Sequence, residues 1–390
     1  MIVRRLAKED LYGAGLVSHV AFHGRTEDIA AERAKWENNP EEEDWGAFTE
    51  DGRVAARIIN NHFESRVDGH LVRNGGIGSV STLPEYRGSG AVREIFSQLL
   101  PEARKNGEVI STLYPFLHSF YRKFGYEALS CRNRFTLTPA QLNSFPQPGW
   151  VRQWLPGEDV GEFTRTYSRF AERYNLAVRR DDRRMADQQI NGLYYKDRRF
   201  AYLMGDGPEP DAYVVFQDIF DPAGARMEVR ETAWTCRKGF QSALGFLSRF
   251  TADYRETVID LPSDLDLRMY ARNPYEIRFE PQCDHMIRVV NAEKLLALTD
   301  KPAGTEFVIS VSGDEQIPEN NGIWLVRGSE VSRTDRTPDM STSIRALGLM
   351  AVGAIGLEEA ELRRDVEVYS GRKALRTVFR RKPIYVGDRF

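Results

Sequence analysis

The sequence has few cysteines and lacks the motifs of disulfide frameworks and zinc sites. Its 390 residues include only three cysteines, Cys131, Cys236 and Cys283, an odd number with wide spacing and no C-x-x-C pair. No H-E-x-x-H motif occurs among its six histidines. We therefore expect no metal, and we interpret the three cysteines as packing residues.

Long apolar runs are also missing. No stretch approaches the roughly 20 apolar residues of a membrane helix, and the N-terminal MIVRRLAKEDLYGAG lacks the apolar core of a secretion signal. The sequence thus predicts a cytoplasmic protein without a membrane span. A net charge of −3 argues against a dedicated nucleic-acid binder, so we expect no nucleic-acid partner.

The order of expected elements predicts an α/β (α+β) fold. A strand and a helix come first, followed by a hairpin with an Asp51-Gly52 turn. A strand at Ile77–Leu83 then runs through a glycine-rich turn into a helix with a 3.6-residue apolar period. A proline-containing stretch, 145–149, closes this domain.

Two further domains follow. The second repeats the order of the first more coarsely and without the glycine turn, and the third contains a small-residue helix at Ser343–Ala354 and ends in a strand-like Pro383–Val386. We place the three domains at residues 1–147, 148–285 and 286–390.

The segment from Val80 to Arg93 has the pattern of an anion-binding turn. A strand there enters a glycine-rich turn that opens a helix, so backbone N–H groups and the helix N-terminus can hold a pyrophosphate. A dinucleotide-binding turn is the competing interpretation. It requires a third glycine, which Gly88-x-Gly90 lacks, and it follows the first strand of its domain.

The same segment resembles the coenzyme A motif of the GNAT superfamily of N-acetyltransferases, Arg/Gln-x-x-Gly-x-Gly/Ala. Arg87 and Gly90 match, and Val92 departs from the last place. Leu83-Pro84-Glu85-Tyr86-Arg87-Gly88 has the form that precedes the turn in this family. Phe120-Tyr121-Arg122-Lys123-Phe124-Gly125-Tyr126 matches the signature Phe-Tyr-x-x-x-Gly-Phe/Tyr. The resemblance implies acetyl-CoA as the co-substrate.

The resemblance also assigns roles along this segment. Backbone groups of Val80, Ser81 and Thr82 would bind the pantetheine amides. The pyrophosphate would be held by the turn and the start of the helix, which comprise Arg87, Gly88, Ser89, Gly90, Ala91, Val92 and Arg93. Phe116 and Leu117 would border the thioester. Tyr121 would protonate the departing thiolate as general acid, although its alternative interpretation is a core aromatic residue with its hydroxyl at the surface.

Three domains in this order resemble the enhanced intracellular survival (Eis) acetyltransferases, whose third domain is similar to sterol carrier proteins. This resemblance implies a homohexamer and a general base formed by the C-terminal carboxylate, here that of Phe390. A free α-carboxyl group titrates near ~3.5, so the role requires burial beside the thioester to raise its pKa. The alternative for Phe390 is a frayed terminus.

The acetyl acceptor is expected to be a primary amine, either an aminoglycoside-like polyamine or a lysine. Trp36 lines the acceptor pocket or packs in a core. Family members that acetylate aminoglycosides have acids where this chain has Gly24 and Arg389. Because no cysteine or serine lies beside a base in the motif region, we expect direct attack without a covalent intermediate. The rival interpretation is a non-catalytic protein that senses acyl-CoA and lipid.

Overall fold

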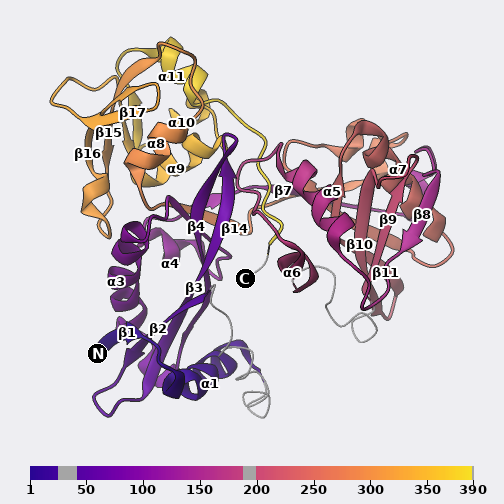
Figure 1. The fold of residues 1–390 in the computed structure, drawn as a ribbon, viewed down its shortest axis with the longest axis horizontal. Coiled ribbons are helices and arrows are strands. Elements are labelled where there is room, and N and C mark those ends of the chain that lie inside the picture. The colour runs from indigo at the N-terminus through magenta and orange to yellow at the C-terminus, as the bar shows by residue number, and fades with distance from the viewer. Residues whose placement is uncertain (25–41, 188–198, 389–390) are drawn as a thin grey trace. The chain divides into compact units, whose positions relative to one another are not determined.

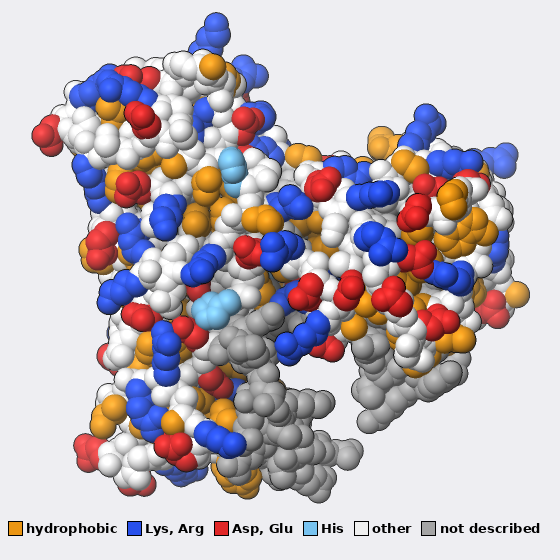
Figure 2. All heavy atoms as spheres, viewed as in Figure 1, with side chains coloured by type: hydrophobic (Ala, Val, Ile, Leu, Met, Phe, Trp, Pro, Cys, Tyr) orange, Lys and Arg blue, Asp and Glu red, His pale blue; other side chains and the backbone are white. Residues whose placement is uncertain are grey.

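The computed structural model describes residues 1–24, 42–187 and 199–388 (Figure 1). The described residues divide into two compact units, the first made of residues from 1–129 and 284–381 and the second of residues from 130–283 and 382–388. Within the described residues, no helix is both long enough and apolar enough to cross a membrane. On the face drawn in Figure 2, basic and acidic side chains are intermingled on both units.

The first unit begins with a seven-stranded mixed sheet of order β1-β2-β3-β4-β5-β14-β6. Its strands are β1 (Ile2–Arg5), β2 (Glu42–Phe48), β3 (Val54–Val67), β4 (His70–Thr82), β5 (Ile110–Leu113), β6 (Glu127–Leu129) and β14 (His285–Val289). The helices α1 (Leu11–Phe22), α3 (Ala91–Lys105) and α4 (His118–Arg122) accompany it. The expected hairpin is confirmed, because β2 and β3 pair antiparallel across the Asp51-Gly52 turn.

A strand from much later in the chain completes this sheet. β14 lies between β5 and β6, with Met286 opposite Leu113 on one side and His285 opposite Leu129 on the other. All five of its residues are buried. The structural division thus differs from the expected boundary at residue 285, since the strand that opens the expected third domain belongs to the first sheet.

A second sheet of the first unit has the order β17-β16-β15-β18-β19. It contains β15 (Glu306–Ser312), β16 (Gly322–Arg327), β17 (Glu330–Arg333), β18 (Met340–Ser343) and β19 (Val366–Val368), with α8 (Ala292–Leu298), α9 (Ile344–Val352), α10 (Leu357–Ala360) and α11 (Arg372–Val378). The expected small-residue helix is confirmed as α9. It packs against β14, and it ends at Gly353, whose φ of 81° suits glycine.

The second unit has its own seven-stranded sheet, β13-β7-β12-β11-β10-β9-β8. Its elements are β7 (Arg132–Leu137), β8 (Trp150–Gln153), β9 (Arg199–Gly205), β10 (Ala212–Asp221), β11 (Gly224–Trp234), β12 (Glu256–Pro262), β13 (Arg278–Gln282), α5 (Gly161–Ala171), α6 (Asp182–Met185) and α7 (Arg237–Leu247). The boundary expected at residue 147 also differs, because β7 pairs with β12 and β13 of this sheet.

The C-terminal segment 382–388 belongs to the second unit. The expected strand at Pro383–Val386 is wrong, since the segment forms a single bridge, between Ile384 and Asn175, rather than a strand. The interpretation of the cysteines also needs correction. Cys131 is buried, but Cys236 and Cys283 are exposed and therefore are not packing residues.

Candidate active site

The end of β4 parts from β5 and carries a bulge. The parallel pairing of the two strands ends at Ile77 opposite Leu113, whereas β4 continues to Thr82. On its other edge, Ser79 and Val80 together face one residue of β3, and Ser79 has a φ of 50°. A bulge takes backbone groups out of the regular ladder. The last residues of β4 can therefore offer main-chain groups to an amide-bearing ligand on the β5 side.

The turn after β4 forms a cradle of free amides. Gly88 and Gly90 have φ values of 81° and 90°, which glycine adopts without strain, and open space surrounds the position of a Cβ at either residue. The N–H groups of Gly88, Gly90, Val92 and Arg93 have no hydrogen-bond acceptor within the part of the chain that the structure describes. Four unsatisfied N–H groups at the start of a 15-residue helix are suited to bind an anion.

The predicted cofactor residues differ in exposure. Arg87, Gly88, Ser89 and Arg93 are exposed, whereas Val80, Thr82, Gly90 and Val92 are partly buried. Ser81 and Ala91 are buried. The Ser81 hydroxyl donates to the Ser79 carbonyl at 3.0 Å. Ser81 and Ala91 can therefore contribute only main-chain groups and packing to a ligand.

Tyr121 lies on α4 in the same apolar cluster as Val80, Ala91 and Val92. Its ring centroid is 5.4 Å from that of Phe116 and 5.1 Å from that of Phe120. The residue is buried, yet its hydroxyl bonds to no other residue that the structure describes. Burial raises the pKa of the Tyr121 phenol, so it stays protonated at neutral pH. Phe116 and Leu117, just before α4, are exposed apolar side chains.

Comparison with known proteins identifies the families of two domains in this chain. Residues 2–129 match the family model of the acetyltransferase (GNAT) domain. The chain carries a GNAT acetyltransferase domain. Residues 293–386 match the family model of the sterol carrier protein domain. The expected types of the first and third domains are therefore confirmed. Among curated proteins, none matches the chain.

Solved structures share the fold over the whole length of this chain. A GCN5-related N-acetyltransferase from Anabaena variabilis is 19% identical, with a TM-score of 0.88 and full coverage of both chains. A probable N-acyltransferase from Enterococcus faecalis is 18% identical, with a TM-score of 0.86 and 99% coverage of each. Eis1 from Mycobacterium abscessus is 19% identical, with a TM-score of 0.82 and full coverage. The expected Eis-like architecture is therefore confirmed as a fold.

A buried arginine from β14 fixes the turn that carries Tyr121. Arg288 donates from Nε to the Phe124 carbonyl at 2.7 Å and from Nη2 to Asp314 Oδ1 at 2.7 Å. The Phe124 amide in turn donates to the Tyr121 carbonyl at 2.9 Å. Sequence reasoning missed this residue, because Arg288 lies 164 positions beyond Phe124 and only the placement of β14 in the GNAT sheet brings them together.

A second missed cluster joins β3 of the GNAT domain to the loop before β5. Buried Glu108 accepts hydrogen bonds from Asn60 Nδ2 at 2.8 Å and His62 Nδ1 at 3.1 Å. His62 Nε2 lies 3.7 Å from Glu43. Hydrogen bonds to Glu108 and Glu43 raise the pKa of His62 to about 9. His62 is therefore a cation at neutral pH and balances part of the acidic charge around it.

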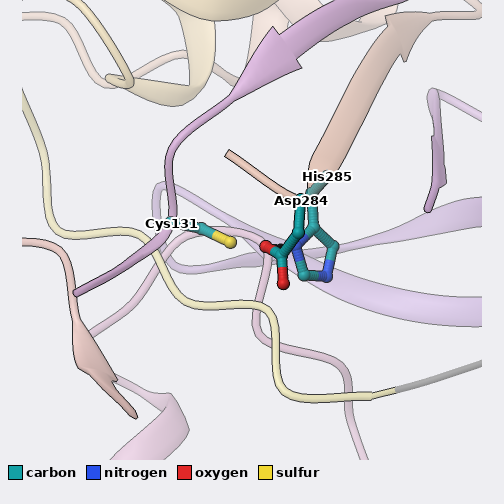
Figure 3. Close-up of side chains that lie close together, drawn as sticks. All are labelled: Cys131, Asp284 and His285. Carbon is teal, nitrogen blue, oxygen red and sulfur yellow. Dashed lines mark hydrogen bonds and ion pairs between the residues drawn. The ribbon is translucent and has the colours of Figure 1, made fainter. Parts of the chain in front are cut away.

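Figure 3 shows Asp284 and His285, whose side chains lie next to each other at the start of β14. His285 Nδ1 is 2.8 Å from Asp284 Oδ1, and its ring lies 4.0 Å from that of Tyr114. Cys131, also labelled in the figure, belongs to the second unit. Within the first unit the pair supplies two donor groups, fewer than the three or four protein ligands of a zinc site.

The second unit has a cavity of about 880 Å³. Trp234 at the end of β11, Arg237 at the start of α7 and Pro383 of the C-terminal segment are among its lining residues. Only Thr235 and Cys236 join β11 to α7, so this unit has no counterpart of the glycine turn in the GNAT domain. Two predicted residues, Trp36 and Phe390, lie outside the described residues.

Proposed function

We propose that the protein transfers an acetyl group from acetyl-CoA to a primary amine by direct attack. The observation that carries this proposal is the set of four unpaired N–H groups between Gly88 and Arg93, next to an apolar cluster that contains Tyr121. A pyrophosphate bound at the four amides would direct the pantetheine arm along the parted end of β4. The thioester would then lie toward Tyr121 and the exposed Phe116 and Leu117.

The reaction needs a hydrogen-bond donor to the thioester oxygen and a proton donor to the leaving sulfur. The amine nitrogen forms a bond to the carbonyl carbon, and a main-chain N–H of the β4 bulge at Val80 to Thr82 stabilises the oxyanion that develops. When the C–S bond breaks, Tyr121 donates its proton to the thiolate. The phenol is protonated at neutral pH, so its proton is available when negative charge develops on sulfur.

The amine proton needs an acceptor, which we assign to the C-terminal carboxylate of Phe390. This assignment and that of Trp36 to the acceptor pocket rest on resemblance to the Eis family, as does a homohexameric assembly. The acceptor itself is a small polyamine or a peptide lysine. An amine panel that includes aminoglycosides, simple diamines and lysine peptides would distinguish these classes by release of free thiol.

Replacing the phenol tests the general acid. We expect Tyr121→Phe to lower kcat by about 100-fold or more, because the variant removes proton donation but keeps the ring. Tyr126→Phe is a matched control from the same cluster, since its hydroxyl bonds to Ser111 at 2.8 Å and is assigned no role in the proposed reaction. Equal kcat values for Tyr121→Phe and the wild type would exclude Tyr121 as the acid.

Extending the chain tests the base. One added C-terminal glycine moves the carboxylate by a residue and should abolish turnover, whereas a glycine added at the N-terminus should not. Full activity of the C-terminally extended enzyme would exclude the terminal carboxylate. If acetyl-CoA binds tightly but no amine of the panel releases thiol, the rival function of an acyl-CoA and lipid sensor is favoured instead.

A further inference from the structure

The two sheets part in the same way but differ in what lies beyond the opening. In the first unit, β4 and β5 separate after Ile77 and Leu113, and residues 83–90 lead from β4 to α3. In the second unit, β11 and β12 separate after Val229 and Ile259. Since only two residues join β11 to α7, the second opening cannot hold a pyrophosphate in the same manner.

The chain's own C-terminal segment is seated at this second opening. The Asn175 amide donates to the Pro383 carbonyl at 2.9 Å, and the Tyr385 amide donates to the Asn175 carbonyl at 3.0 Å. Tyr385 is buried against Phe170, with ring centroids 5.1 Å apart. Its hydroxyl donates to Glu231 Oε2 at 3.4 Å, and Glu231 lies on β11 two residues beyond the last pair with β12.

A buried ionic cluster holds the end of the segment. Asp388 and Arg180 both have fully buried side chains. Asp388 Oδ2 accepts from Arg180 Nη2 at 2.9 Å, and its Oδ1 accepts from Arg184 Nε at 3.0 Å. Arg180 also makes a two-point contact with Glu231, at 2.8 Å for each bond. Two cations and two anions thus balance within the second unit.

This cluster specifies the register of the segment. A buried ion pair contributes little net stability, because desolvation offsets its attraction, but one that loses a partner is strongly unfavourable. A slip of one residue would bring either Gly387 or Arg389 to the place of Asp388. The first leaves Arg180 and Arg184 short of an anion, and the second adds a third cation. Only the observed register satisfies the cluster.

We propose that the second unit is a receptor for the C-terminal segment, and that Arg180 and Asp388 act as positioning residues for the terminal carboxylate. Phe390 follows Asp388 by two residues in the sequence, so an anchored Asp388 limits how far the terminal carboxylate can move. The catalytic part of this inference rests on the proposed function, in which that carboxylate accepts the amine proton. The receptor part rests on the contacts of the second unit alone.

The test uses the full-length enzyme and Asp388→Asn, which keeps the shape of the side chain and removes its charge. We expect carboxypeptidase to remove C-terminal residues at least about tenfold faster from this variant, since 1.4 kcal/mol of local stability corresponds to a factor of ten. We also expect kcat to fall while the Kd for acetyl-CoA is unchanged. Asp335→Asn, at an exposed acid of the first unit, is the matched control and should change neither quantity.

Unchanged carboxypeptidase release in Asp388→Asn would overturn the receptor. If release is faster but kcat is unchanged, the enzyme with one added C-terminal glycine separates the two proposals. Loss of activity on extension would then overturn only the positioning role, whereas retained activity would overturn the proposed base itself. If Asp388→Asn fails to fold, Arg184→Met, which removes one of the two cations from Asp388, provides the same comparison.

Discussion

The two units of this chain use similar sheets for different purposes, and the difference lies at the point where two parallel strands part. In the first unit, the parted strand β4 leads into an exposed turn with four amides that no described residue binds. In the second unit, the parted strand β11 carries Glu231, which binds the chain's own C-terminal segment through Arg180 and Tyr385. In the two proposals, one sheet architecture therefore serves as a cofactor site in one unit and as a peptide site in the other.

Each unit also contains a buried arginine that ties distant segments together. Arg288 joins the turn after α4 to Asp314 in the first unit, and Arg180 joins Glu231 to Asp388 in the second. The first arginine contacts the segment of the proposed general acid, and the second contacts the segment that precedes the proposed general base. The proposed acid and base are thus each supported by a fully buried cation.

The largest expected effect follows from removing the first of these cations. We expect Arg288→Met to lower the free energy of unfolding by about 3–5 kcal/mol, because Asp314 is left as an unpaired buried charge. Urea denaturation measures this loss. Arg336→Met removes an exposed partner of Glu306 and should cost only about 0–1 kcal/mol. Similar losses in the free energy of unfolding for both variants would show that burial does not determine how much the Arg288 contact stabilises the protein.

A smaller effect is expected at the glycine turn. Gly90→Val introduces a β-branched residue at a φ of 90° and should distort the amide cradle. We expect acetyl-CoA affinity to fall about 10- to 100-fold, which corresponds to about one hydrogen bond to a charged group. Calorimetric titration measures the affinity.

The second unit offers a matched control for this variant. Gly157 has a φ of 93° and open space around its Cβ position, so Gly157→Val imposes similar backbone strain away from the turn. It should leave acetyl-CoA affinity unchanged. An equal loss of affinity in the two variants would attribute the effect to general destabilisation and not to the turn.

The smallest effect is the dependence of stability on pH. We expect opposite dependences for the contribution of His62 to the first unit and that of Asp388 to the second. The raised pKa of His62, about 9, means that its contribution to the first unit is complete below pH 6.5 and is lost as pH rises through 9. Because the side chain is 36% exposed, we expect only about 1 kcal/mol. The difference in stability between wild type and His62→Gln should therefore be larger at pH 6 than at pH 10.

Asp388 should show the reverse dependence. Burial favours its neutral form, but the charges of Arg180 and Arg184 outweigh burial and hold the pKa of Asp388 below its usual value. Its contribution to the second unit is present above the ordinary carboxyl pKa and is lost as pH falls through the lowered one. Equal pH profiles for wild type and the His62→Gln and Asp388→Asn variants would contradict both assignments.

The turn and the helices of the first domain could be predicted from local sequence patterns. The apolar period of α3 and the glycines at 88 and 90 depend on neighbouring residues, as does the match around Tyr121, so the turn and α4 could be predicted. The roles of Arg180, Glu231 and Asp388 could not, because their contacts join residues 51 and 208 positions apart. The placement of β14 between β5 and β6 was missed for the same reason, and the expected boundary at residue 285 therefore differs from the structural division.

Hydrogen exchange with and without acetyl-CoA tests the central claim most directly, namely that the turn of the first unit is the acetyl-CoA site. If the claim is right, acetyl-CoA slows exchange of the amides at residues 80–93 and leaves residues 230–239 of the second unit unchanged. If exchange at 88–93 does not change, or if residues 230–239 become protected instead, the assignment of the cofactor site is contradicted.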